Sequence, residues 1–300
     1  MRSVIKNFWP LLKHTVREWN AKDPFRQSAV IAYYAIFSIP GLLVLIIAIA
    51  GYFFGKDVVS QHILEQISRT MGANTAQQIS EVLIQANSER STLFGTIVGL
   101  AILLLGATGV FIELQKTLNI IWHVESVTKK GIWPILKARL FSFGLIMAIA
   151  FLLLISLVVS ALITALTSWL HAGDVGFWAA VFHVINFLIS LAVISFLFAL
   201  MYKILPDAKI EMRHVWLGAV LTGLLFTIGK TALALYFEKA NPGSAYGAAS
   251  SIILILLWVS YSSMILFFGA EFTYLYTKTF SRVQPSEIAV KTDPHKQSLV

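Results

Sequence analysis

Six long runs of apolar residues alternate with shorter polar segments along this chain of 300 residues. Each run has about 20 residues or more, the length that an α-helix needs to cross the roughly 30 Å hydrocarbon core of a bilayer. We therefore predict an all-α, polytopic membrane protein built as a bundle of six transmembrane helices. The predicted spans are Ala29–Phe54, Leu93–Ile112, Leu140–Thr167, Trp178–Tyr202, Trp216–Tyr236 and Ala248–Tyr276.

Two polar segments carry apolar residues at helical spacing. Residues 4–20 predict an interfacial helix in which basic residues lie between the apolar positions Ile5, Phe8, Leu12, Val16 and Trp19. The chain then divides into a cytoplasmic interfacial helix (1–28), a six-helix transmembrane domain (29–278) and a flexible cytoplasmic tail (279–300).

The segment from Gly55 to Ser91 predicts two short amphipathic helices, separated near Gly72 and Asn74. Their apolar stripes must face the bundle, the membrane surface or a partner. We expect this outer loop, residues 55–91, to lie over the outer mouth of the bundle as a lid or docking surface.

The composition agrees with a bilayer as the solvent of the chain. Hydrophobic residues make up 57% of the sequence and charged residues only 13%, about half the charged share of a soluble domain. Cysteine is absent, which excludes disulfides, thiolate metal sites and a cysteine nucleophile.

The basic residues are distributed unevenly between the two sides of the predicted bundle. Eighteen Lys and Arg residues lie in the two terminal segments and the second and fourth loops, against four in the other loops. Cytoplasmic loops retain such residues, so both termini should be cytoplasmic. The net charge of +8 then indicates anionic lipid headgroups as partners, and no nucleic-acid partner is required.

Two ionisable residues stand out within the predicted spans, Lys230 and Glu271, because a charge there is costly and indicates function. The rise per residue places Lys230 near the outer side, at a depth similar to those of His183 and Asn186. These three residues form a candidate outer polar cluster. The alternative is that Lys230 extends its stem along lipid and places its amine in the headgroup region.

The second ionisable residue, Glu271, lies at the inner boundary of the last span. The residues at its level form a candidate inner polar cluster, which comprises Glu271, Tyr33, Tyr34, Glu113 and Arg139. In the first span, Pro40 and Gly41 indicate a hinge, because proline removes a backbone donor.

The sequence shows no catalytic machinery. Acidic clusters, Ser/His/Asp spacing and a glycine-rich phosphate loop are missing, and His183 has no second ligand at zinc spacing. We expect no enzyme activity, no metal and no cofactor.

Several motifs resemble the BrkB/YihY-type bacterial inner-membrane proteins, once mislabelled as ribonuclease BN. The resemblance covers roughly residues 20–278. Its motifs are Ala32-Tyr33-Tyr34 with Ser38 and Pro40, Leu118-Asn119-Ile120-Ile121-Trp122, Gly229-Lys230 with Tyr236, Tyr246-Gly247-Ala248-Ala249, Trp258, Tyr261 and Gly269-Ala270-Glu271-Phe272.

The resemblance implies a six-helix protein of the bacterial inner membrane with a role in the cell envelope. It brings no established substrate or reaction, and ribonuclease activity would need clustered metal ligands that this chain lacks. Buried polar residues at two depths and a helix broken by proline suit a transporter or flippase-like permease for an unidentified substrate. The alternative is a non-transporting envelope scaffold or assembly protein, in which buried polar residues serve helix packing.

Overall fold

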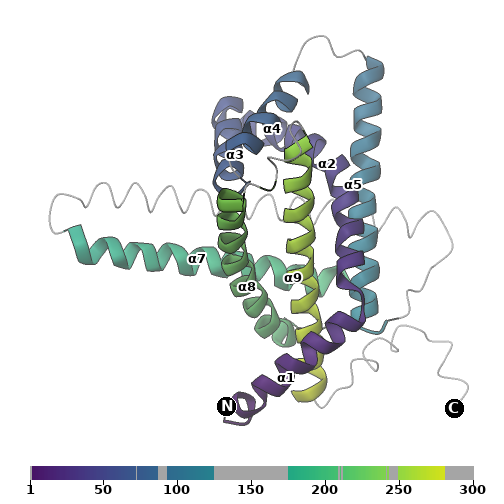
Figure 1. The fold of residues 1–300 in the computed structure, drawn as a ribbon, viewed down its shortest axis with the longest axis vertical. Helices are drawn as coiled ribbons and strands as arrows, with labels where there is room; N and C mark the ends of the chain where they lie inside the picture. The colour runs from purple at the N-terminus through teal and green to yellow at the C-terminus, as the bar shows by residue number, and fades with distance from the viewer. Residues whose placement is uncertain are drawn as a thin grey trace, which may run out of the picture. The chain divides into compact units, whose positions relative to one another are not determined.

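The computed structural model describes residues 2–71, 73–86, 93–124, 175–208, 210, 212–240, 242 and 249–280 (Figure 1). Every regular element in these ranges is helical. The elements are α1 (Arg2–Ala21), α2 (Pro24–Phe54), α3 (Lys56–Met71), α4 (Ala73–Ala86), α5 (Leu93–Ile121), α7 (Val175–Ile204), α8 (Met212–Ala240) and α9 (Ser250–Phe280).

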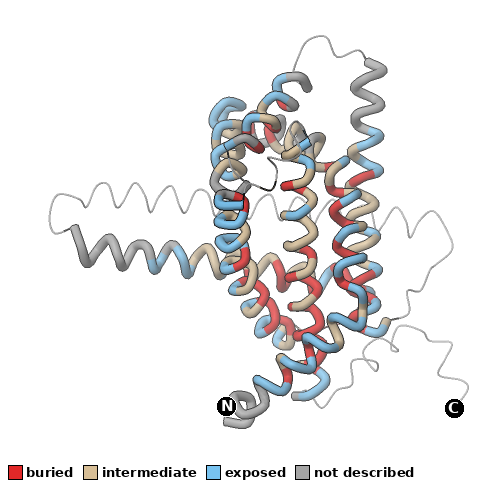
Figure 2. The backbone as a smooth tube through the Cα atoms, in the orientation of Figure 1, coloured by how far each residue is buried: buried red, intermediate tan, exposed pale blue. Residues whose placement is uncertain are grey.

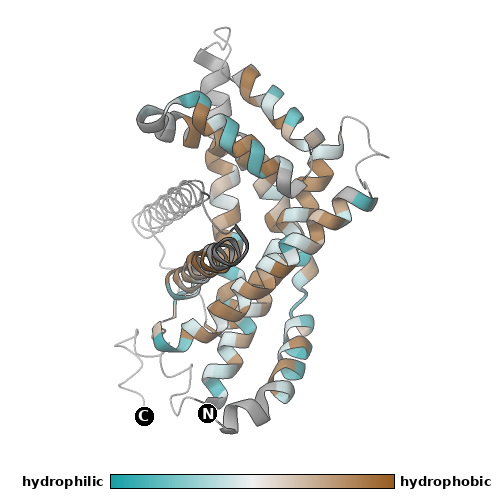
Figure 3. Cartoon of the chain, turned by 90° about the vertical axis from the view of Figure 1, so that its left-hand side faces the viewer, coloured by the Kyte–Doolittle hydropathy of each residue, from teal (hydrophilic) through white to brown (hydrophobic). Residues whose placement is uncertain are grey.

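Four helices of the described chain are long and apolar enough to cross a membrane. Their apolar segments are Ala101–Ile121, Phe187–Ile204, Met212–Phe237 and Ser250–Thr279. Figure 3 shows the apolar residues along these long helices. The all-helical membrane class is confirmed. The count of six stays a prediction, because Leu140–Thr167 lies outside the described residues and α2, which carries the predicted span Ala29–Phe54, is not one of these four helices.

The helices extend beyond the predicted spans. The second span was predicted to end at Ile112, but α5 continues to Ile121 through Glu113 and Lys116. A span estimated from apolar residues marks the part that lipid can surround, whereas the hydrogen-bonded helix continues through polar residues of good helix propensity.

Contacts divide the chain into two compact units. Unit 1 comprises Met1–Thr15, Leu118–Leu225 and Gly269–Val300, and unit 2 comprises Val16–Thr117 and Phe226–Phe268. Helices α1, α5, α8 and α9 each contribute to both units.

In unit 2, glycines allow pairs of helices to pack closely. A Cβ atom at Gly109 of α5 would collide with the ring of Tyr34 of α2, and one at Gly41 of α2 would lie 2.9 Å from Leu103 Cβ of α5. A Cβ atom at Gly229 of α8 would likewise collide with the Tyr261 side chain of α9. In membrane helices, small residues let the backbones approach closely. Close packing is needed there because lipid is as apolar as the side chains, so the hydrophobic effect does not drive the helices together.

The short helices α3 and α4 pack against the long helices of unit 2. Ile79 and Leu83 of α4 are buried with Ile47 of α2 and Ile255 of α9, and four residues of α3 join this cluster: Val59, Ile63, Leu64 and Ile67. Gln78 Nε2 also donates a hydrogen bond to Ser250 Oγ at 3.2 Å. The apolar stripes of residues 55–91 are therefore used within the chain, and the position of this segment outside the membrane stays a prediction.

Helix α1 buries one stripe in the protein, and part of the stripe that the sequence predicts to be interfacial is exposed. Leu11 and Thr15 are buried, whereas Val16 is 49% exposed, and the side chains of Ile5 and Phe8 lie outside the described residues. Figure 2 shows both buried and exposed residues along α1. Trp19 packs its ring against Phe25 and Phe268, with centroid separations of 6.1 and 5.9 Å. Thr15 fits the buried face because its hydroxyl donates to Leu11 O at 2.9 Å, which satisfies its polar atom within the helix.

Candidate functional site

The last third of α9 presents two different polar faces within unit 1. Gly269 and Thr273 are four residues apart and therefore lie on one face of the helix. Glu271, Tyr274 and Lys278 follow one another at spacings of three and four, on another face. The two faces have different neighbours, which are described in turn.

On the face with Gly269, the hydroxyl of Thr273 is one of four buried hydroxyls. We call this group the hydroxyl core: Ser195, Tyr202, Thr222 and Thr273. Thr222 Oγ1 donates to Gly218 O at 2.6 Å and lies 2.9 Å from the Tyr202 hydroxyl. A threonine hydroxyl has one hydrogen, so Tyr202 must be the donor to Thr222. The two hydrogen bonds therefore form a chain: Tyr202 of α7 donates to Thr222, and Thr222 donates to the backbone of α8.

Each hydroxyl of this core lies against a glycine of a neighbouring helix. A Cβ atom at Gly218 would collide with Thr273, and one at Gly269 would collide with both Thr222 and Tyr202. A Cβ atom at Gly223 would lie 2.5 Å from Ser195 Oγ. Helices α7, α8 and α9 thus interlock through glycines and hydroxyls, a packing mode suited to a surrounding of lipid.

Glu271 is a buried carboxylic acid of unit 1, with only 1% of its surface exposed. One turn further along the same face, Tyr274 packs edge-to-face on Trp122, the first residue after α5, with ring centroids 5.8 Å apart. His123 stacks on Tyr274 at 4.9 Å, and the Lys278 ammonium lies 5.9 Å from the centre of the same ring. Glu271 therefore lies next to an aromatic cluster, Trp122, His123 and Tyr274, that joins α5 to α9.

Asn119 and Asp207 join the end of α5 to the segment between α7 and α8. Asn119 Nδ2 donates to Asp207 Oδ2 at 2.8 Å, and Asn119 Oδ1 accepts from the Asp207 backbone N–H at 2.8 Å. Asn119 is buried and Asp207 is exposed. This paired contact fixes the segment between α7 and α8 to the end of α5, three residues before Trp122.

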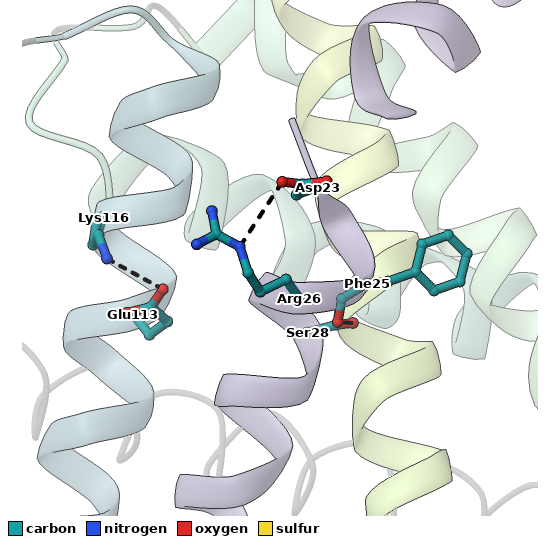
Figure 4. A network of polar contacts seen from close by, with 6 residues as sticks. All are labelled: Asp23, Phe25, Arg26, Ser28, Glu113 and Lys116. Carbon is teal, nitrogen blue, oxygen red and sulfur yellow. Dashed lines mark hydrogen bonds and ion pairs between the residues drawn. The ribbon is translucent and has the colours of Figure 1, made fainter. Parts of the chain in front are cut away.

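The other residues of the predicted inner cluster lie in unit 2 or outside the described residues. Tyr33 is 59% exposed and meets the ring of Tyr34 edge-to-face at 5.7 Å. Glu113 pairs with Lys116 of the same helix at 3.6 Å, and Figure 4 shows this pair beside that of Arg26 with Asp23. Arg139 lies outside the described residues. A cluster that includes Glu271 of unit 1 stays a prediction.

The predicted outer cluster and hinge also stay predictions. Lys230 is exposed, and the side chains of His183 and Asn186 on α7 lie outside the described residues. Helix α2 runs without a break through Pro40, and the ring of Pro40 lies outside the described residues. Gly41 contacts Leu103, which shows a role in packing.

Several residues that the predicted clusters omit have a signal in the sequence. Asn119 and Trp122 belong to a motif that resembles the family, and Tyr274 is three residues from Glu271. Tyr202 and Thr222 had no such signal, because isolated hydroxyls are common in membrane helices. In the part of the chain that the structure describes, no group of three His, Asp or Glu side chains could hold a metal ion.

Three relatives illustrate what the chain is similar to. A UPF0761 membrane protein of Alcanivorax borkumensis is 26% identical over 89% of this chain and 59% of its own length. One of Alteromonas mediterranea is 30% identical over 59% of this chain and 57% of its own length. One of Glaesserella parasuis is 26% identical over 71% of both chains.

The chain spans less than three fifths of the length of the first two relatives. No solved structure matches it. The sequence model of the family described as Virulence factor BrkB matches residues 15–292. Since that match covers most of the chain, the protein belongs to the BrkB family, as its motifs indicate.

Proposed function

We propose that this membrane protein is a transporter or flippase-like permease of the bacterial inner membrane, with its N- and C-termini in the cytoplasm. The observation that carries the proposal is the burial of Glu271 inside an apolar helix of unit 1. The proposal includes no catalytic step, no cofactor and no nucleic-acid partner.

The argument rests on the cost of placing a carboxyl group in this environment. By insertion scales an acidic residue at the centre of a membrane helix costs on the order of 2.5 kcal/mol, an upper value for Glu271, which is predicted to lie at the inner boundary of its span. Packing does not require that cost, because glycines and hydroxyls already interlock α7, α8 and α9. A side chain that is costly and not needed for packing suits contact with a polar substrate or a coupling ion.

A non-transporting envelope scaffold is the second candidate, and the glycine contacts favour it. The pairs Gly218 with Thr273, Gly269 with Thr222, and Gly229 with Tyr261 hold helices at close range. A bundle interlocked in this way is suited to a fixed shape that presents surfaces to other envelope proteins. In that case Glu271 serves to fix α9 against its neighbours.

The experiment that separates these functions uses the purified full chain in phospholipid vesicles. Lipid movement is followed as the fraction of a fluorescent phospholipid that a membrane-impermeant reductant can reach, and solute movement as the rate of osmotic swelling. A transporter of either kind should exceed protein-free vesicles in one of these assays, and Glu271→Gln should remove the excess.

Two controls make the result interpretable. Thr277→Val changes a buried polar residue on the hydroxyl-bearing side of α9, whose hydroxyl donates only to Thr273 O, and it should retain the excess. Helical content and elution volume of each variant should equal those of the unaltered protein. A folded protein that is inactive in both assays, with a panel of ionic and neutral solutes, would favour the scaffold.

A further inference from the structure

Helix α1 has two apolar faces, of which one is buried in the protein. Leu11 is 7% exposed and Thr15 is fully buried. Further along the helix, Trp19 packs on Phe268 of α9. These residues hold α1 against the rest of the chain.

The second apolar face of α1 is exposed. Trp9, Leu12 and Val16 occur at spacings of three and four residues, so they form one stripe along the helix. Trp9 is 74% exposed and Val16 is 49% exposed, while Leu12 is half-buried. Tryptophan is an amphipathic ring that prefers the boundary between lipid and water.

Basic side chains flank this stripe. Lys13 and Arg17 are both exposed and lie one turn apart, along one edge of the stripe. The acidic residue of this region, Glu18, lies on the opposite side of the helix by the 100° turn per residue. Positive charge beside an exposed apolar stripe is the pattern of helices that lie in a membrane surface.

The connection to α2 holds α1 close to the membrane. Helix α1 ends at Ala21 and α2 begins at Pro24, after a left-handed turn at Asp23 with φ of 50°. Phe25, in the first turn of α2, is 63% exposed and packs on Trp19. Because α2 carries the first predicted span, which begins at Ala29, the short connection keeps α1 near the predicted bilayer boundary.

We propose that α1 binds the surface of an anionic phospholipid bilayer. Trp9, Leu12 and Val16 enter the boundary between headgroups and acyl chains, and Lys13 and Arg17 contact headgroup phosphates. This site is independent of the proposed transport function. It also specifies which face of the predicted interfacial helix meets lipid, since Leu11, Thr15 and Trp19 are already used by the protein.

The absence of cysteine allows a direct test on the full chain. Single variants Val16→Cys and His14→Cys, each labelled with an environment-sensitive fluorophore, are placed in nanodiscs of phosphatidylcholine alone or of equal parts phosphatidylcholine and phosphatidylglycerol. His14 is exposed and lies on the face away from the stripe, which makes it the matched control. Quenching by lipids that carry a spin label near the headgroup reports contact with the membrane.

We expect strong quenching of the Val16 label in nanodiscs with phosphatidylglycerol, weak quenching in phosphatidylcholine alone, and little quenching of the His14 label in either. Lys13→Gln and Arg17→Gln are each added separately to the Val16→Cys chain. Either substitution should lower the ratio of membrane-bound to free α1 by about fivefold. Equal quenching in both lipids would overturn the assignment of an anionic partner. A Val16 label that is shielded in both lipids without quenching would show that a second copy covers the stripe, and would also overturn the proposal.

Discussion

Asn119 binds Asp207 through both ends of its side-chain amide, with two hydrogen bonds of 2.8 Å across 88 positions of sequence. One bond goes to the carboxylate and the other comes from the backbone N–H of the same residue. This pair fixes the end of α5 to the loop that follows α7, inside unit 1.

Removing the amide of Asn119 should weaken the fold at this end of unit 1. Asn119→Ala loses one charge-assisted and one backbone hydrogen bond, so we expect the free energy of unfolding to fall by about 2 kcal/mol. Asp207→Asn is the control, because it keeps the backbone N–H and an acceptor oxygen and should cost about half as much. Equilibrium unfolding by dodecyl sulfate in mixed micelles measures both, and equal losses would contradict the assigned bonding.

The direction of the Tyr202 hydrogen bond can be tested by comparing two substitutions. Tyr202→Phe removes a donor and leaves Thr222 bonded to Gly218, so it should cost about 1 kcal/mol. Thr222→Val removes the acceptor of a fully buried tyrosine hydroxyl and should cost about 2 kcal/mol. The double variant should be less destabilised than the sum of the two losses. The same unfolding assay decides, and a larger loss for Tyr202→Phe would reverse the assigned direction.

A single methyl group added at Gly218 should disturb the contact between α8 and α9. A Cβ atom there collides with Thr273, so Gly218→Ala should lower the free energy of unfolding by about 1–3 kcal/mol. Adding Thr273→Ala to that variant removes the obstructing hydroxyl and should restore part of the loss. Ala232→Val, at an exposed position of the same helix, should change stability by less than about 0.5 kcal/mol.

Lys230 should tolerate substitution as far as folding is concerned. It is exposed, so Lys230→Gln should leave the free energy of unfolding within about 0.5 kcal/mol of the original value. Transport in vesicles then tests the outer polar cluster: Lys230→Met should abolish it if Lys230 contacts substrate, whereas Lys230→Arg and Lys230→Gln should retain it if the amine only reaches the headgroups.

The orientation of the chain follows from its basic residues and is open to reporter fusions. Alkaline phosphatase should be inactive when fused after Ser281 and active when inserted between Gly55 and Ser91, because Lys and Arg are retained on the cytoplasmic side. Green fluorescent protein fused after Ser281 is the complementary reporter and should fluoresce. The opposite pattern would exclude cytoplasmic termini.

The sequence by itself determined the properties that depend on position along the chain. Run length predicts a helix that crosses the bilayer, which is why α2, α5, α7, α8 and α9 coincide with predicted spans. The motifs around Asn119 and Glu271 indicated the family that the sequence model confirms. The sequence also shows that the carboxyl group of Glu271 lies within the last predicted span, because this too depends only on position along the chain.

The tertiary structure alone decided which face of each helix meets which neighbour. In a soluble protein the apolar stripe points to the core, but a helix in lipid is apolar on all sides and its pattern gives no direction. Depth alone groups Glu271 with Tyr33 and Tyr34, and that grouping stays a prediction. The structure adds that Glu271 is buried one turn from Tyr274, whose ring meets Trp122 and His123. The pairing of Gly269 with Thr222, and of Asn119 with Asp207, required the chain to fold, because each contact depends on helix rotation and on partners distant in sequence.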